Sequence, residues 1–283
     1  MKQVGILGYP LGHTLSPKIH EAGFRELDLD ISFKVWEVKP EDLKSKIDHL
    51  KSENILGFCV TLPHKLSIID LIDNLDESAK NMNAVNWVVN QNGKLKGYNT
   101  DWLGFKESLK FYGKKISNKK CLILGAGGSA KAICMALINE NADKIYIYNR
   151  TYKNVRDFVN NFNKFNKSVE IIDSKKVNDK EFVNTLDMII NTTSVGMQGG
   201  PAPNISPINT DIINKRALCY DLVYSPEITP FIEKAKNNNI ETIGGITMLV
   251  FQAIQGFELV TGKNAPVNKM LEAVGIIKNI EDE

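Results

Sequence analysis

A glycine-rich turn in the middle of the chain constrains the fold more than any other feature. The apolar run Lys120–Leu124 leads into Gly125-Ala126-Gly127-Gly128-Ser129-Ala130, and an amphipathic stretch over residues 129–139 follows. A strand, a tight turn and a helix in this order are typical of a dinucleotide-binding α/β fold. Glycine permits positive φ and close backbone approach, and the helix N-terminus offers free N–H groups to a pyrophosphate. A ligand-free βα turn is the alternative, but a strand about 20 residues on favours the dinucleotide.

The end of that second strand, Lys144–Tyr148, distinguishes between the two nicotinamide dinucleotides. An NAD site usually ends this strand with Asp or Glu, which binds the ribose 2′-hydroxyl. Here Asn149-Arg150-Thr151 follows, Lys153 is close behind, and no carboxylate is present to repel a 2′-phosphate. A guanidinium fork suits phosphate. A solvated basic loop is the alternative; with the glycine turn upstream, we predict NADP.

Length and periodicity predict two α/β domains. The chain has 283 residues, and a domain takes roughly 150. Apolar runs alternate with amphipathic stretches, which predicts parallel sheets covered by helices. Residues 90–93, Asn-Gln-Asn-Gly, are expected to form a hairpin turn at the edge of the first sheet. A second unit is expected to begin near residue 102. Strands are expected over 4–8, 32–38, 55–61, 84–90, 120–124, 144–148, 169–172, 188–191, 217–222 and 241–243, and helices over 17–27, 41–51, 102–112, 129–139, 154–165 and 247–260.

Composition excludes several classes of protein. Lys and Arg number 35 against 33 Asp and Glu, a net charge of +2, which argues against a nucleic-acid binder. No apolar run reaches the roughly 18 residues of a membrane span, and the N-terminus does not resemble a signal peptide. The cysteines are far apart and His residues are few, so we expect reduced thiols in a cytoplasmic protein and no metal site.

Two hydroxyls follow the first strand of the chain. Thr14 and Ser16 are two residues apart and can both point at an anion such as a carboxylate. Ser16 before Pro17 is also a common helix N-cap, with proline in the first turn. Both interpretations can hold, since a helix start is itself an anion site.

Three further polar residues lie in or near the expected strands and helices of the first half. Lys65 follows the third strand, and a partly buried lysine can act as an acid or base, although a surface charge is the commoner case. Asn86 lies inside an apolar strand and needs partners, either neighbouring backbone or a substrate hydroxyl. Asp101 precedes a helix; it is either an N-cap or a carboxylate that holds the ammonium of Lys65.

Together these motifs resemble one family, shikimate dehydrogenase, over nearly the whole chain. The matching segments are Thr14-Leu-Ser16-Pro17, Val60-Thr61-Leu-Pro63-His-Lys65, Asn83-Ala-Val85-Asn86, Asn99-Thr100-Asp101, Gly125 to Ala130, Asn149-Arg150-Thr151, Asn191-Thr192-Thr-Ser-Val-Gly196-Met197, Tyr220-Asp221-Leu-Val-Tyr224 with Thr229-Pro230, and Gly245-Ile-Thr-Met248-Leu-Val-Phe-Gln252. The resemblance implies two α/β domains with the active site in the cleft. One is a discontinuous substrate domain, residues 1–101 plus 245–283, and the other is a Rossmann-like NADP-binding domain, residues 102–244.

The resemblance also implies roles for single residues. Lys65 and Asp101 would lie at the reacting hydroxyl. The substrate-binding set would be Thr14, Ser16, Thr61, Asn86, Tyr224 and Gln252. Thr192 and Gly245 would join the glycine turn and residues 149–153 in binding NADP. The chain departs from the usual family pattern at Thr14, Cys59, Asn83, Trp102, Asn154 and Thr247.

The implied activity is reversible NADPH-dependent reduction of 3-dehydroshikimate to shikimate, in chorismate and aromatic amino-acid biosynthesis. The nearest alternative is a shikimate/quinate dehydrogenase that uses NAD. A non-catalytic NADP-binding protein on the same fold would bind cofactor without turnover. A folate-linked dehydrogenase lacks support, because Thr61, Asn86 and Gln252 suit a polyol. The expected partner is a small-molecule substrate, and both a monomer and a homodimer fit.

Overall fold

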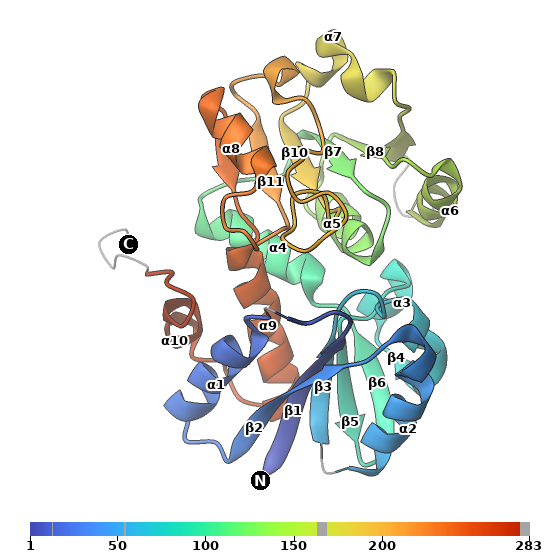
Figure 1. Ribbon diagram of the computed structural model, residues 1–283, viewed down its shortest axis with the longest axis vertical. Helices are drawn as coiled ribbons and strands as arrows, with labels where there is room; N and C mark the ends of the chain where they lie inside the picture. Colours follow the sequence, from blue (N-terminus) through green and yellow to red (C-terminus); the bar gives the residue numbers. More distant parts are fainter. Residues whose placement is uncertain (13, 54, 163–168, 278–283) are drawn as a thin grey trace. The chain divides into compact units, whose positions relative to one another are not determined.

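The computed structural model describes residues 1–12, 14–53, 55–162 and 169–277; the side chains of residues 152–154, 157 and 161 lie outside the description. The chain divides into two compact units, Met1–Phe105 with Leu249–Glu283 (unit 1) and Lys106–Met248 (unit 2). It passes between the units within α4 (Asp101–Phe111) and within α9 (Ile246–Thr261). Among the described residues, each unit has its own six-stranded sheet (Figure 1). The protein therefore has the expected α/β fold.

The sheet of unit 1 is mixed, with strand order β2-β1-β3-β5-β6-β4. β1 pairs in parallel with β2 and β3, whereas β5 is antiparallel to both β3 and β6. The antiparallel direction brings the first residues of β5 to the edge where β1 and β3 end. The strands are β1 (Lys2–Gly8), β2 (Ile31–Glu37), β3 (Ile55–Val60), β4 (Asn74–Leu75), β5 (Trp87–Gln91) and β6 (Lys94–Tyr98).

The two faces of this sheet are covered by different helices, because successive side chains of a strand point to opposite faces. Phe58 belongs to an apolar cluster with Ile47 of α2 (Leu43–Ser52). Trp87 faces the other way, toward α1 (Ser16–Glu26) and α9. Phe24 of α1 stacks on Phe257 of α9 with ring centroids 5.3 Å apart. The smaller helices of this unit are α3 (Glu77–Met82) and α10 (Val267–Glu272), and α10 contacts α1.

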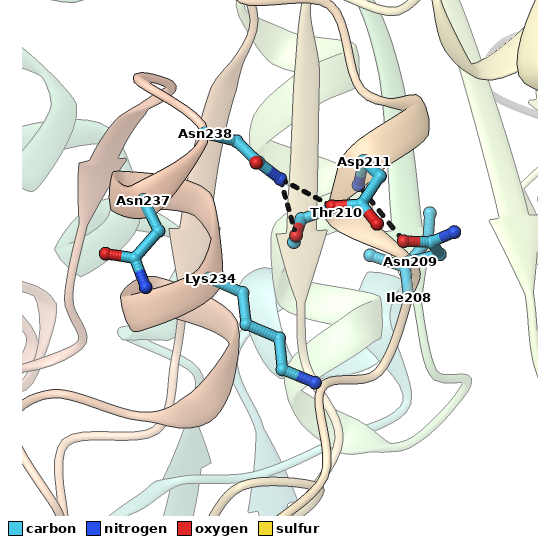
Figure 2. A pocket seen from close by; sticks show the side chains of 7 residues that line it. All are labelled: Ile208, Asn209, Thr210, Asp211, Lys234, Asn237 and Asn238. Carbon is cyan, nitrogen blue, oxygen red and sulfur yellow. Dashed lines mark hydrogen bonds between the residues drawn. The ribbon is translucent and has the colours of Figure 1, made fainter.

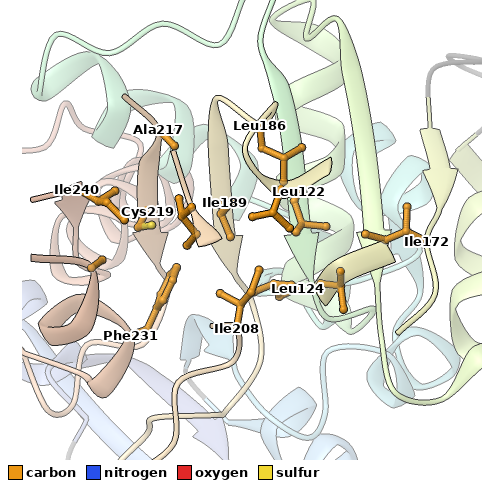
Figure 3. Close-up of a cluster of buried hydrophobic side chains, with 14 residues drawn as sticks. Leu122, Leu124, Ile172, Leu186, Ile189, Ile208, Ala217, Cys219, Phe231 and Ile240 are labelled. Atoms are coloured by element: carbon orange, nitrogen blue, oxygen red, sulfur yellow. The ribbon is translucent and has the colours of Figure 1, made fainter. Parts of the chain in front are cut away.

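The sheet of unit 2 is parallel throughout, in the order β12-β11-β10-β7-β8-β9. The order reverses between β7 and β10, the position where open α/β sheets bind ligands beyond their carboxyl ends. One face carries an apolar cluster that includes Leu122, Ile189 and Phe231 (Figure 3). The elements are β7 (Lys120–Leu124), α5 (Gly128–Asn139), β8 (Lys144–Tyr148), α6 (Tyr152–Phe162), β9 (Val169–Ile171), α7 (Lys180–Val183), β10 (Met188–Asn191), β11 (Leu218–Asp221), α8 (Pro230–Asn237) and β12 (Glu241–Ile243).

A polar cavity of about 260 Å³ lies in unit 2 between η4 (Thr210–Ile212) and the end of α8 (Figure 2). Asn238 donates to Thr210 Oγ1 at 3.1 Å and to Asp211 Oδ1 at 3.0 Å, so its amide is engaged within the wall. These segments precede β11 and β12. The cavity therefore lies toward the amino ends of the strands, at the opposite edge from the glycine turn.

Most predicted strands and helices are present, with differences at particular places. The hairpin at residues 90–93 is confirmed, but the edge strand is β4, a two-residue strand too short to be predicted from periodicity. The strand expected over 84–90 begins only at Trp87, and Val85 N donates to Lys65 O instead. The predicted set lacks helices α3, α7, α8 and α10, each of which is eight residues or shorter. Residues 163–165 of the helix expected over 154–165 lie outside the described residues. No described helix combines the length and apolarity that a membrane crossing requires.

Candidate active site

The polar residues of unit 1 meet because three strand ends converge at one edge of its sheet. Thr61 and Lys65 follow β3, and Asn86 directly precedes β5. Val60 N donates to Asn86 O at 2.7 Å, which joins the end of β3 to the start of β5. Asp101 begins α4, three residues after the end of β6, the next strand of the sheet.

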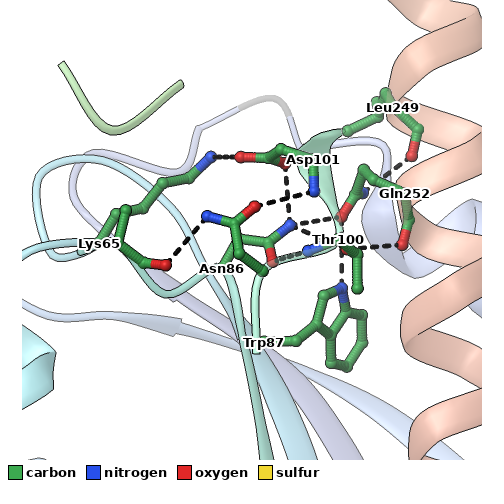
Figure 4. Close-up of polar contacts among 9 residues, drawn as sticks. Lys65, Asn86, Trp87, Thr100, Asp101, Leu249 and Gln252 are labelled. Atoms are coloured by element: carbon green, nitrogen blue, oxygen red, sulfur yellow. Dashed lines mark hydrogen bonds and ion pairs between the residues drawn. The ribbon is translucent and has the colours of Figure 1, made fainter. Parts of the chain in front are cut away.

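Lys65 and Asp101 form an ion pair at this edge. Lys65 Nζ lies 2.5 Å from Asp101 Oδ2, and the two side chains are only 12% and 7% exposed. Asp101 Oδ1 accepts from Asn86 Nδ2 at 2.8 Å (Figure 4). Partial exclusion of water strengthens the attraction between the two charges. An N-cap role for Asp101 does not account for these bonds, and the interpretation of Lys65 as a surface charge is wrong, because 36 residues of chain fold back to bury it against Asp101.

Both polar atoms of the Asn86 side chain are engaged by neighbouring residues. Its Nδ2 donates to Thr100 Oγ1 at 2.9 Å and lies 3.3 Å from Gln252 Oε1, and its Oδ1 accepts from Thr100 N at 2.7 Å. Thr100 Oγ1 in turn donates to Gln252 O at 3.0 Å. Thr100 was not among the predicted site residues. Its position between Asn99 and Asp101 in the sequence could have indicated that Thr100 belongs to the site.

The helix cap formed by the hydroxyl residues after β1, Thr14 and Ser16, differs from the predicted one. Ser16 is buried and is the first residue of α1; the residue before it, Leu15, makes no side-chain cap. Instead, Thr14 Oγ1 accepts from Ser16 N at 3.3 Å. The expectation that Ser16 is the N-cap is therefore wrong, because the threonine two residues upstream takes a backbone donor of the first turn.

Cys59 lies on β3 beside these groups. Burial raises the pKa of its thiol to about 12, so the sulfur stays protonated. Sγ donates to Gly5 O at 3.5 Å. The side chain therefore acts as a small, neutral wall of the site rather than as a nucleophile.

The glycine turn of unit 2 leaves space and backbone donors for a phosphate group. Gly125 has φ +114, and a Cβ there would meet Thr192 Oγ1 at 2.6 Å. Gly127 is exposed with open space where a side chain would stand, and it is itself the N-cap residue of α5. Thr192 Oγ1 donates to Leu124 O at 2.8 Å, so the segment after β10 adjoins the turn after β7. The geometry fits a pyrophosphate at the helix N-terminus.

The residues after β8 present polar groups to solvent. Arg150 and Thr151 are exposed, and Asn149 Nδ2 donates to Thr151 O at 3.1 Å. No carboxylate of the described residues is bonded to Arg150. The side chain of Lys153 lies outside the described residues.

Tyr224 and Gly245 were also predicted to contact ligands. Tyr224 follows β11 and is partly buried in unit 2. Gly245 is buried, and a Cβ there would overlap the carbonyl of Leu222. Close backbone packing therefore explains this glycine, and its contact with cofactor stays a prediction.

A buried carboxylate, Asp221, joins the segments that follow β10 and β11. It accepts from Asn191 Nδ2 at 2.9 Å, Val223 N at 3.0 Å and Thr229 Oγ1 at 2.6 Å. Burial raises its pKa to about 6, and these three hydrogen bonds oppose that rise. Asn191 and Asp221 were predicted only as parts of matching segments, without a role. Their position at the ends of adjacent buried strands was the signal that they form one network.

Two family models match the chain. One, described as the shikimate dehydrogenase substrate binding domain, covers residues 6–88, and the other, shikimate/quinate 5-dehydrogenase, covers residues 107–247. The chain belongs to the shikimate dehydrogenase family. A curated relative, shikimate dehydrogenase (NADP(+)) of Nitrosopumilus maritimus, is 40% identical over 273 residues, which is 96% of this chain and 98% of the relative.

Solved structures of shikimate dehydrogenases have the same fold. The enzyme of Aquifex aeolicus is 33% identical, with a TM-score of 0.88 over 97% of this chain and 98% of that one. Shikimate 5-dehydrogenase of Thermus thermophilus, solved in complex with NADP(H) and shikimate, is 29% identical, with a TM-score of 0.85 over 96% and 98%. The two-unit α/β architecture of this member of the shikimate dehydrogenase family is thus that of ligand-bound relatives.

Proposed function

We propose that this chain is an NADP-dependent shikimate dehydrogenase, which catalyses the reversible reduction of 3-dehydroshikimate to shikimate in chorismate biosynthesis. The observation that carries the proposal is the Lys65–Asp101 pair, 2.5 Å apart at the converging strand ends of unit 1. A glycine turn that leads into the N-terminus of α5 in unit 2 supports the dinucleotide part of the reaction. Reduction needs both a proton donor and a hydride source, and these two features supply the residues for each.

We assign residues 1–101 plus 245–283 to the substrate-binding domain and residues 102–244 to the cofactor-binding domain. The free, buried cysteines fit a reducing cytoplasmic compartment. Both a monomer and a homodimer are compatible with this assignment.

The substrate carboxylate would be held by the hydroxyls of Thr14 and Ser16. The Ser16 hydroxyl is not used as a helix cap, which supports this role. Thr61 and Gln252 would bind ring hydroxyls. Asn86 would act in addition by holding Asp101, because Nδ2 has its two shortest contacts with Asp101 Oδ1 at 2.8 Å and Thr100 Oγ1 at 2.9 Å. Tyr224 would lie near the carboxylate end.

The cofactor would be bound by Gly125 to Ala130, Thr192 and Gly245, with Asn149, Arg150, Thr151 and Lys153 at its 2′-phosphate. Arg150 offers a planar donor fork that suits this group. The reduced nicotinamide supplies the hydride when it is bound. The absence of Asp or Glu after β8 favours NADP over the NAD-dependent alternative.

In the reductive direction, the Lys65 ammonium donates a proton to the substrate oxygen as negative charge develops on it. Asp101 holds that ammonium in place through Oδ2, and Asn86 holds Asp101 through Oδ1. Proton transfer by a positioned side chain contributes about 10²- to 10⁴-fold to rate. The pair acts as a unit, so losing either member is expected to remove most of that factor.

The test is a spectrophotometric assay of the reduced nicotinamide, with shikimate and quinate each offered with NADP and NAD. We expect activity with shikimate and NADP, and a kcat for Lys65→Ala that is lower by about 100-fold or more. The exposed Lys94 of the same unit provides the matched control, Lys94→Ala, with unchanged activity. A Lys65→Ala variant that keeps kcat and raises only KM would show that Lys65 merely binds. Cofactor binding without turnover would support the non-catalytic alternative.

A further inference from the structure

The carboxamide of Gln252 is fixed by three neighbours, of which Trp87 and Leu249 lie outside the set that would touch substrate. Trp87 Nε1 donates to Gln252 Oε1 at 3.2 Å, and Asn86 Nδ2 lies 3.3 Å from the same oxygen (Figure 4). Gln252 Nε2 donates to Leu249 O at 2.8 Å. These contacts occupy the oxygen and one amide hydrogen.

These partners determine which way round the amide lies. An indole N–H can only donate, and a backbone carbonyl can only accept. Trp87 therefore requires the oxygen of Gln252 on its side, and Leu249 requires the nitrogen. The reversed amide would place an N–H against an indole N–H and an oxygen against a carbonyl. Only one of the two Nε2 hydrogens is used by a described residue.

The indole of Trp87 is itself held by its surroundings. Its side chain is fully buried, and the ring of His20 meets it edge-on, with centroids 5.3 Å apart. On α9, a Cβ at Gly256 would overlap the indole ring, so only glycine leaves room for it there. Trp87 is thus held between His20 of α1 and Gly256 of α9, and Gly256 lies one helical turn after Gln252.

We infer that Trp87 is a positioning residue, which fixes Gln252 as a hydrogen-bond donor to the substrate. This inference rests on the proposed function. The bound substrate atom is then an oxygen that accepts, and the proton of that same hydroxyl goes to a different acceptor. Trp87 itself touches no substrate atom and acts through the amide alone.

The experiment compares Trp87→Phe with wild type in steady-state oxidation of shikimate by NADP. Phe keeps an aromatic ring and removes the N–H. The variant loses the hydrogen bond from Trp87 to Gln252, and the Gln252 amide can then rotate by 180°. KM for shikimate should therefore rise about five- to tenfold. We expect kcat to stay within about twofold and KM for NADP to be unchanged. Trp36→Phe is the matched control: Trp36 lies in the same sheet but packs on Phe58, and no change in KM is expected.

A double-mutant cycle separates positioning from general loosening of the fold. In a Gln252→Ala background, Trp87→Phe should have no further effect on KM. An equal rise in KM in that background, or unchanged KM in the single variant, would overturn the inference. If Trp87→Phe does not fold, 3-benzothienylalanine at position 87 keeps the shape of the indole and removes only the donor, and the same rise in KM is expected. Wild-type protein that does not oxidise shikimate would instead overturn the proposed function itself.

Discussion

His20 is a buried histidine of unit 1. Its ring is fully buried, and neither nitrogen has a hydrogen-bond partner among the described residues. Phe33 stacks on one face with centroids 4.9 Å apart, and Trp87 meets it edge-on. Burial lowers the pKa of the imidazole to about 3. The residue therefore packs as a neutral ring, and we assign it no catalytic role.

This burial predicts sensitivity to acid. The unfolded chain takes up a proton near pH 6.5, whereas the folded protein does not until about pH 3. The contribution of His20 to stability is therefore complete above pH 6.5 and is lost as pH falls toward 3. Relative to wild type, His20→Phe should gain roughly 2 kcal/mol in free energy of unfolding between pH 6.5 and 4.5. Denaturant titrations at each pH measure the difference.

The control for this prediction is His49→Gln, since His49 is exposed and its side chain pairs only with Glu53 among the residues that the structure describes. Its free energy of unfolding should follow that of wild type across the same range. Parallel curves for wild type and His20→Phe would contradict the assignment of His20 as a buried neutral ring.

At the scale of elements, the loops expected to bind a dinucleotide lie at the carboxyl ends of the strands of unit 2. The turn after β7, the segment after β10 and the residues after β8 all leave the same edge of a parallel sheet. Asp221 ties the segment after β10 to the segment after β11. A rigid edge of this kind holds its backbone donors in place before the ligand binds, so binding loses little conformational entropy.

Arg150 provides the prediction at this scale. If its guanidinium binds the 2′-phosphate, Arg150→Ala should raise KM for NADPH by about 10- to 100-fold. KM for NADH should change little, because that cofactor has no 2′-phosphate. Initial rates with both cofactors measure the ratio. Arg156→Ala, an exposed arginine on α6, is the matched control. Equal effects on both cofactors would contradict the role.

For the whole molecule, the two units differ in whether their residues are continuous in the sequence. Unit 2 is one continuous segment, whereas unit 1 needs residues from both ends. The C-terminal segment supplies Gln252 and Gly256, which complete the surroundings of Trp87. Within unit 2, Ser108 of α4 bonds to the buried Tyr220 hydroxyl at 2.8 Å, so that part of α4 belongs with its sheet.

We therefore expect a fragment of residues 106–248 to fold alone and to bind NADPH, and a fragment of residues 1–105 to lack a stable fold. Circular dichroism melts and nicotinamide fluorescence on each fragment measure this. The reason is that the first fragment contains its whole sheet, whereas the second loses the helix that covers one face. A fragment 106–248 that is unfolded would contradict the division of the chain.

Local patterns in the sequence were enough to predict most strands, the long helices, the glycine turn and the basic loop after β8. These features are encoded locally, in the period of apolar residues and in turn residues such as Gly125. The sequence also indicated Lys65 after a strand, Asn86 inside one and Asp101 before a helix.

Which of those groups meet depends on how the strands pack in three dimensions. Lys65 reaches Asp101 because β5 runs antiparallel to β3, a pairing that no local pattern specifies. The bond from Trp87 to Gln252 joins residues 165 positions apart. The carboxylate of Asp221 likewise accepts from Asn191, which lies 30 residues earlier in the chain. Hydrogen-bond partners of buried side chains depend on how distant segments pack, whereas helices and strands depend mainly on the order of residues within them.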